Sequence, residues 1–193
     1  MSGPPPPAAP QEGPLVALPV YAGVSELELG IMVAVCSLCG GEGAARTVSR
    51  SRASIVTAGG LVSTPHVLYA ALPEPAALLL PGGPGAAKAA RDLLLREFLA
   101  RHAALPTGAS GSGLLLLGDA GGLRGRVVGG PADLEGTLWG HGPDDVRPGE
   151  VVTDRLLTTT PGGLPALHAA LAVAAHVWGE DAAREAAGRL GRA

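Results

Sequence analysis

Short apolar runs alternate with longer amphipathic segments along most of this chain. Buried strands are predicted at 15–21 and 77–80, and short strands at 47–49, 53–57 and 105–110. A hairpin is expected at 151–159. Helical spacing predicts helices over 26–38, 86–102, 114–120 and 164–177, and a short one over 181–190. Strands that alternate with helices predict an α/β fold, a three-layer α/β/α sandwich around a mainly parallel sheet.

The first two predicted helices show specific signals. Ser25 is placed to cap the first helix, and Gly40 and Gly41 are placed to end it. Apolar residues keep helical spacing in this helix at Leu27, Ile31, Val35 and Leu38. In the second helix we expect Leu94, Phe98 and Leu99 to face inward, and Lys88, Arg91 and Arg96 to face outward.

The first fourteen residues, MSGPPPPAAPQEGP, differ from the rest of the chain. Four consecutive prolines favour polyproline II and cannot join a hydrogen-bonded core. We therefore expect residues 1–14 to form a disordered Pro-rich tail and residues 15–193 to form one domain. A docking peptide is the alternative interpretation of the tail.

Composition and charge narrow the class of protein. Of 193 residues, 47% are hydrophobic and only 16% are charged, which favours a tightly packed domain over a disordered chain. No apolar run approaches the roughly 18 residues of a membrane span. The first residues lack the pattern of a signal peptide, so a cytoplasmic location is expected. The net charge is −3, and the basic residues are scattered along the chain. Their densest group, Arg46, Arg50 and Arg52, has no aromatic neighbours, so we do not expect direct binding of nucleic acid.

Cys36 and Cys39 form a Cys-x-x-Cys motif within the first predicted helix. Redox motifs of this kind place the first cysteine at a helix N-terminus, where the helix dipole lowers its pKa. These two cysteines fall in the C-terminal half of the helix, and two cysteines alone do not make a structural zinc site. We expect them to be small buried residues, and we expect no metal and no cofactor.

Three loops should meet at the carboxyl edge of the predicted sheet, where α/β proteins bind their ligands. They are residues 22–28, 81–85 and 108–113. The third loop contains Ser110-Gly111-Ser112-Gly113, a sharp turn between a strand and a helix. Turns of this type present a nucleophile in several α/β enzymes.

In these loops the chain resembles the DJ-1/PfpI superfamily, which has a class I glutamine amidotransferase-like, flavodoxin-like fold. The resemblance covers about residues 15 to 190. It rests on the sequences GVSELEL (23–29), LPGG (80–83), GDAGGLRGR (118–126) and LTTTPGG (157–163), together with the turn at 110–113. It is nearest the branch of isonitrile hydratases and of the sensor domains of some AraC-type regulators. It implies a homodimer.

The resemblance assigns expected roles to four positions. Glu28 falls at the acidic position that contacts the nucleophile, although a surface glutamate favoured by the helix dipole is the alternative. Gly82 and Gly83 match the loop whose backbone N–H groups face the nucleophile. Gly111 occupies the place of the nucleophilic cysteine, where a non-glycine residue would be strained by about 1–3 kcal/mol.

Two further positions also depart from a catalytic pattern. Ser112 falls where isonitrile hydratases have threonine, and the histidine of the superfamily would fall near Pro131. A serine nucleophile needs a general base, and none of the five histidines lies in the three loops. We therefore expect Ser112 to be a hydrogen-bonding group or a helix cap, and neither it nor Ser110 to be a nucleophile.

The leading hypothesis is a protein without the catalytic cysteine, a non-catalytic homodimer with a regulatory or stress-related role. Its pocket at Glu28, Gly82, Gly83, Gly111 and Ser112 would bind a small polar ligand. The first alternative is a hydrolase or hydratase that uses Glu28 and water. The second is a stand-alone relative of AraC-type sensor domains, which would need a partner to reach DNA.

Overall fold

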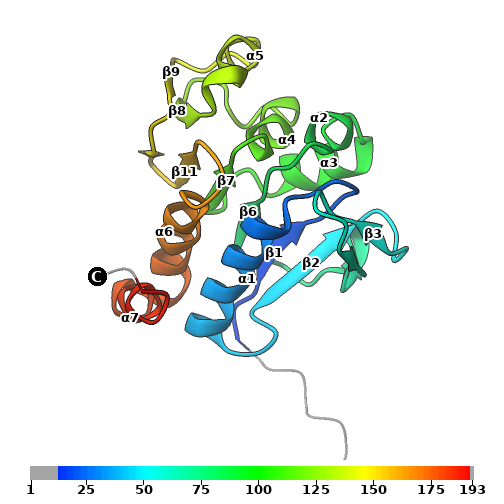
Figure 1. The fold of residues 1–193 in the computed structure, drawn as a ribbon, viewed down its shortest axis with the longest axis vertical. Helices are drawn as coiled ribbons and strands as arrows, with labels where there is room; N and C mark the ends of the chain where they lie inside the picture. The colour runs from blue at the N-terminus through cyan, green and yellow to red at the C-terminus, as the bar shows by residue number, and fades with distance from the viewer. Residues whose placement is uncertain (1–12, 192–193) are drawn as a thin grey trace, which may run out of the picture.

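A seven-stranded sheet forms the centre of the computed structural model, which describes residues 13–191 (Figure 1). The predicted tail at 1–14 lies outside the described residues except for its last two. The strand order is β10-β11-β7-β6-β1-β2-β5, and every pair is parallel except β10 with β11. The strands span Val152–Asp154 (β10), Leu157–Thr160 (β11), Thr107–Ser110 (β7), Ala77–Leu80 (β6), Val16–Pro19 (β1), Ala45–Ser49 (β2) and Val67–Leu68 (β5).

Helices cover both faces of this sheet, which confirms the predicted three-layer α/β/α architecture. One face carries α1 (Glu26–Gly40), α6 (Ala166–Trp178) and α7 (Glu180–Arg189), and the other carries α2 (Ala86–Ala89), α3 (Leu93–Arg101) and α4 (Gly113–Asp119). Alternate residues of one strand enter different cores, as the pleat requires. Leu79 packs with α1 and α6, whereas Leu78 and Leu80 pack with α4.

The first helix begins at its predicted cap, because the Ser25 side chain accepts the Glu28 N–H at 3.3 Å. Its core side is formed by Met32, Val35 and Cys36. Leu27, by contrast, is 50% exposed. The apolar spacing in this helix therefore includes residues that do not face the core.

The predicted helix over 86–102 is wrong as a single element. The chain leaves helical geometry after α2, and Asp92 caps a new helix, α3, by accepting the Leu94 N–H at 3.0 Å. Phe98 and Leu99 face the core as predicted. Leu95 is buried with Phe98, while Leu94, which was expected inside, is 52% exposed.

Two small sheets extend the central one, and the sequence pattern predicted neither as a pair. β3 (Ile55–Val56) and β4 (Val62–Ser63) form an antiparallel hairpin beside the start of α1. β8 (Val127–Gly130) and β9 (Asp145–Pro148) form a parallel pair. The segment between β8 and β9 contains a short 3-10 turn, Ala132–Leu134, and α5 (Glu135–Trp139).

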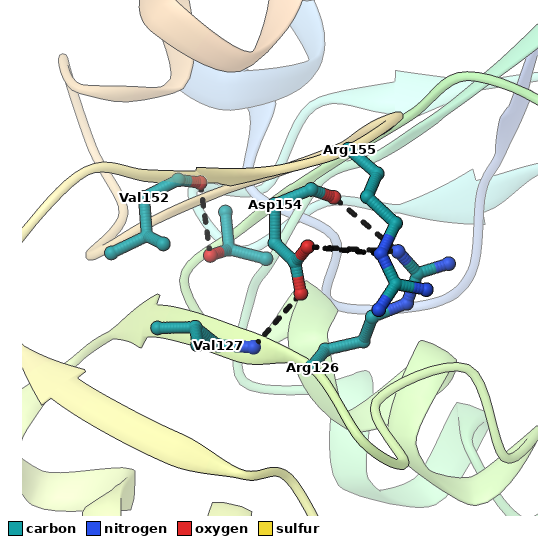
Figure 2. Close-up of polar contacts among 6 residues, drawn as sticks. Arg126, Val127, Val152, Asp154 and Arg155 are labelled. Atoms are coloured by element: carbon teal, nitrogen blue, oxygen red, sulfur yellow. Dashed lines mark hydrogen bonds and ion pairs between the residues drawn. The ribbon is translucent and has the colours of Figure 1, made fainter.

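Asp154 attaches the β8–β9 pair to the central sheet (Figure 2). Its carboxylate accepts the Val127 N–H at 3.0 Å and lies 3.5 Å from Arg155 Nε and 3.9 Å from Arg126 Nη1. A second link joins the same sheets, because the Gly129 N–H donates to the Thr159 hydroxyl at 2.7 Å. These contacts hold the segment after β8 above the carboxyl edge of the central sheet.

Over residues 13–191, no helix is long and apolar enough to cross a membrane.

Candidate functional site

A tight turn joins β7 to α4 at the carboxyl edge of the sheet. The strand ends at Ser110, and Gly111 has a φ of +54°, a left-handed conformation that glycine adopts with little penalty. The Gly111 N–H donates to the Thr160 carbonyl at 2.9 Å, so the turn is held against β11. We call residues 110–113 the elbow.

Glu28 is the buried acid of the site, with 6% of its surface exposed. Its Oε2 accepts the Gly82 N–H at 2.7 Å, and its Oε1 accepts the Gly163 N–H at 2.8 Å. Hydrogen bonds from backbone N–H groups compensate the burial of this carboxylate in the absence of an adjacent cation. Glu28 thus joins α1 to the loops that follow β6 and β11.

The loop after β11 was absent from the three loops predicted to form the site. Gly162 and Gly163 stand in it, next to the elbow. The bond between Gly163 and Glu28 joins residues 135 positions apart, so no local pattern in the sequence indicates it. The only sequence signal that these glycines belong to the site was the LTTTPGG motif. The site therefore comprises four loops.

Gly82 and Gly83 lie directly against the elbow. A β-carbon on Gly82 would stand 2.9 Å from the Ser110 carbonyl oxygen and 2.9 Å from the Ser112 nitrogen, so only glycine permits this approach. The Gly82 N–H is occupied by Glu28, and the Gly83 N–H donates to Ser112 Oγ at 2.9 Å. Both N–H groups that were expected to face a nucleophile therefore have partners within the protein.

Ser112 does not cap α4, although capping was one of its two predicted roles. Its backbone is helical, and its side chain makes no hydrogen bond to the helix. The hydroxyl donates instead to the Gly83 carbonyl at 2.8 Å and accepts the Gly83 N–H. Ser110 is fully buried, and its hydroxyl accepts from Thr160 Oγ1 at 2.9 Å.

The space beside Gly111 is enclosed by the Glu28 carboxylate and by the loop after β11. A β-carbon added to Gly111 would lie 3.2 Å from Glu28 Oε1 and 3.2 Å from Gly162 Cα. A side chain at this position would therefore touch the acid directly.

A hollow of about 570 Å³ opens above the elbow. Glu28, Gly111 and Ser112 line its base, and Pro131 and Asp133, from the segment after β8, line its rim. Within residues 13–191, no lysine, arginine or histidine lines it. Its fixed charges are therefore acidic.

Tyr21 supports the base of the site from below. Its hydroxyl donates to the Pro81 carbonyl at 2.8 Å, which holds the strand end that leads to Gly82. Burial, reinforced by the nearby negative charge of Glu28, raises the pKa of Tyr21 far above its usual value. The phenol therefore acts as a fixed donor.

Cys36 and Cys39 lie away from the hollow. Cys36 is 1% exposed, and burial raises the pKa of its thiol to about 12. Cys39 is only half-buried, so the expectation that both cysteines are buried is wrong for this one. Partial burial raises the pKa of its thiol, which donates to the Ala182 carbonyl at 3.5 Å. Among residues 13–191, no group of three or more His, Cys, Asp or Glu side chains is arranged to hold a metal ion.

No protein-family model matches the sequence, and no curated protein matches it significantly. Solved structures do match the fold. A ThiJ/PfpI family protein from Pseudomonas syringae shares 25% identity and a TM-score of 0.83 over 96% of this chain and 82% of its own. DJ-1beta of Drosophila melanogaster shares 20% identity and a TM-score of 0.84, over 94% of this chain and 99% of its own. A cysteine-to-alanine mutant of a DJ-1 superfamily protein from Salmonella typhimurium shares 25% identity and a TM-score of 0.76, over 93% and 99%.

The sheet order and the layers define a flavodoxin-like α/β protein, and proteins of this architecture bind their ligands at the carboxyl edge of the sheet. The chain has the fold of the DJ-1/ThiJ/PfpI proteins, and the two likenesses at 25% identity support its place in that superfamily.

Proposed function

We propose that this chain is a non-catalytic protein of the DJ-1/PfpI kind, whose hollow above the elbow binds a small polar ligand in a regulatory or stress-related role. The observation that carries the proposal is Gly111. It stands where a side chain would touch the Glu28 carboxylate, and it supplies no reactive atom. Covalent catalysis needs a nucleophile beside a base.

The other polar groups at the base of the hollow are already bound to the protein. Glu28 accepts one backbone N–H on each oxygen, and the Ser112 proton is donated to the Gly83 carbonyl. A ligand would therefore meet a preformed, rigid surface. The acidic lining favours a neutral or cationic ligand over an anionic one.

Activity assays test the non-catalytic assignment. We expect wild-type protein to show no hydrolase, deglycase or isonitrile hydratase turnover above background. Turnover that is abolished by Glu28→Gln or Ser112→Ala, with both variants folded, would overturn the proposal. That result would favour the alternative, in which Glu28 activates water.

Binding is tested by filling the hollow. Ala87 is exposed and lines it, so Ala87→Phe should remove the thermal shift produced by small amides or amines that stabilise the wild type. Ala100→Phe, at an exposed position of α3 outside the hollow, is the matched control. Equal shifts in both variants would contradict binding at this hollow.

A relative of AraC-type sensor domains would bind its ligand at the same place and would in addition require a DNA-binding partner.

We also propose that the chain forms a homodimer through an apolar surface beside the site. Val56 and Val62 pair directly across the β3–β4 hairpin, so their side chains share one face, and they are 54% and 71% exposed. Leu61, in the same hairpin, is 62% exposed. The exposed Leu27 belongs to α1, which contacts the tip of the hairpin where Glu26 accepts the Gly59 N–H. Exposed apolar side chains gathered in this short hairpin favour association.

Light scattering after size-exclusion chromatography tests the dimer. Val62→Asp should convert it to a monomer, because a charge would be buried in the interface. Val151→Asp, at an exposed apolar residue elsewhere, should leave it intact. A monomeric wild type would refute the proposal.

A further inference from the structure

A second hollow, of about 380 Å³, opens at the carboxyl edge of the sheet on the other side of α2. It lies over the ends of β1 and β2, where Tyr21 and Ser49 line it. The helix α2 separates the two hollows, because Ala87 lines the first and Lys88 lines the second. Its size lies within the range of small-molecule sites.

The two hollows carry opposite charge. Arg50, Lys88 and Arg91 line the second hollow together with one acid, Asp92. Arg50 Nη1 lies 3.5 Å from Asp92 Oδ2, so one cation is paired and two positive charges remain in excess. This excess stands in a chain whose net charge is −3. Lys88 is the only lysine in the sequence.

Apolar side chains and hydroxyl groups together form the walls of the second hollow. Ile55 and Leu95 contribute aliphatic surface, and the Tyr69 ring is fixed by stacking on Phe98, with ring centres 5.0 Å apart. Burial raises the pKa of Tyr69, so its hydroxyl stays protonated and remains a hydrogen-bond donor. A ligand here would meet cations at the rim and an aromatic surface within.

We propose that this second hollow binds a small organic phosphomonoester with an aromatic or apolar body. A phosphomonoester carries about −1.5 to −2 charge at neutral pH, which matches the excess of two cations better than a carboxylate does. The Arg91 guanidinium can bind two phosphate oxygens, Lys88 adds a point charge, and Arg50, whose Nη1 pairs with Asp92, can donate through its remaining N–H groups. The apolar walls would cover the body of the ester.

Phenyl phosphate is a suitable probe, measured by titration calorimetry at low salt. We expect saturable binding of one molecule per chain that weakens as salt is raised. Arg50→Ala and Arg91→Ala should each weaken it by about tenfold, since each removes a charge-assisted hydrogen-bond donor. Arg124→Ala, at an exposed residue outside the hollow, should stay within about twofold of wild type.

The single lysine supplies an independent readout at the site. Bound phenyl phosphate should protect Lys88 from acylation by an amine-reactive ester, as followed by mass spectrometry, and the α-amino group serves as the internal control. Absence of saturable binding, binding that the Arg50 and Arg91 variants leave unchanged, or binding without protection of Lys88 would each overturn the proposal. Equal affinity for phenylacetate would also overturn the assignment of a phosphomonoester. Glu28 lines the first hollow and not the second, so Glu28→Gln distinguishes the two sites.

Discussion

Replacing Gly111 by cysteine should place a thiol in the space that the elbow leaves beside Glu28. The perturbation has two parts. Gly111 has a φ of +54°, where any residue with a β-carbon is strained by about 1–2 kcal/mol. The new β-carbon would also lie 3.2 Å from both Glu28 Oε1 and Gly162 Cα, so these neighbours must move by a few tenths of an ångström.

The total cost of Gly111→Cys should be about 2 kcal/mol. Unfolding entropy of about 2.1 cal/mol/K per residue gives about 0.4 kcal/mol/K for this chain, so the melting temperature should fall by about 5 °C. Gly111→Ala is the matched control. It carries the same backbone strain and the same β-carbon contacts without a thiol, so its melting temperature should fall by a similar amount.

The thiol introduced by Gly111→Cys would stand at the start of α4, which favours the thiolate, but next to Glu28, whose negative charge would oppose it. We expect the helix end and the exposure to the hollow to prevail. The variant should react with iodoacetamide faster than Cys36 or Cys39, as followed by peptide mass spectrometry on folded protein. An introduced thiol slower than both native cysteines, or a variant more stable than wild type, would refute this account of the elbow.

Four other outcomes are expected. Deleting residues 1–13 should shift the melting temperature by no more than measurement error, and a large loss would mean that this segment docks on the domain. Cys36 and Cys39 should label in a thiol titration only after denaturant is added, because burial raises the pKa of both thiols. Asp154→Ala should lower the free energy of unfolding by about 1–3 kcal/mol, because it leaves the Val127 N–H without its acceptor. Asp154→Asn should retain part of this stability. Equal melting temperatures for the wild type and both variants would contradict the role of Asp154 in attaching the β8–β9 pair. Partial desolvation and the nearby charges of Arg46 and Arg52 lower the pKa of His66, an exposed residue whose Nδ1 accepts the Thr47 N–H. Its contribution to stability is therefore small; it should be complete above the unfolded-state pKa of about 6.5 and lost as pH falls through the lower folded-state pKa. His66→Gln should remove this part of the pH dependence of melting.

The local sequence was sufficient for the elements whose signals are local. The apolar run at 77–80 coincides with β6, and Ser25 caps α1 as its position predicted. The left-handed backbone of Gly111 was expected from the resemblance to the DJ-1/PfpI elbow, and its φ of +54° agrees with that expectation. Such features depend on neighbours within a few residues, so periodicity, caps and turn residues determine them.

Two of the missed features depend on competition between elements. The break before α3 was not visible in the apolar spacing, because the Asp92 cap competes with continuation of one helix and only packing against the sheet decides between them. The strands of the β8–β9 pair show no clear alternation of apolar and polar residues, and the attachment of the pair relies on Asp154, 27 residues away from Val127.

The candidate site also has features that the sequence predicted and features that only the tertiary structure decided. The sequence by itself placed Glu28 and Gly111 in loops that should meet at one edge of the sheet. Only the tertiary structure brought Gly163 to the second oxygen of Glu28 and turned the Ser112 hydroxyl from the helix toward Gly83. The second hollow likewise exists only because the fold brings Arg50, after β2, beside Lys88 and Arg91 at the other side of α2. Hydrogen bonds and charge clusters between distant segments are set by how the layers pack, and no periodic pattern in the chain records them.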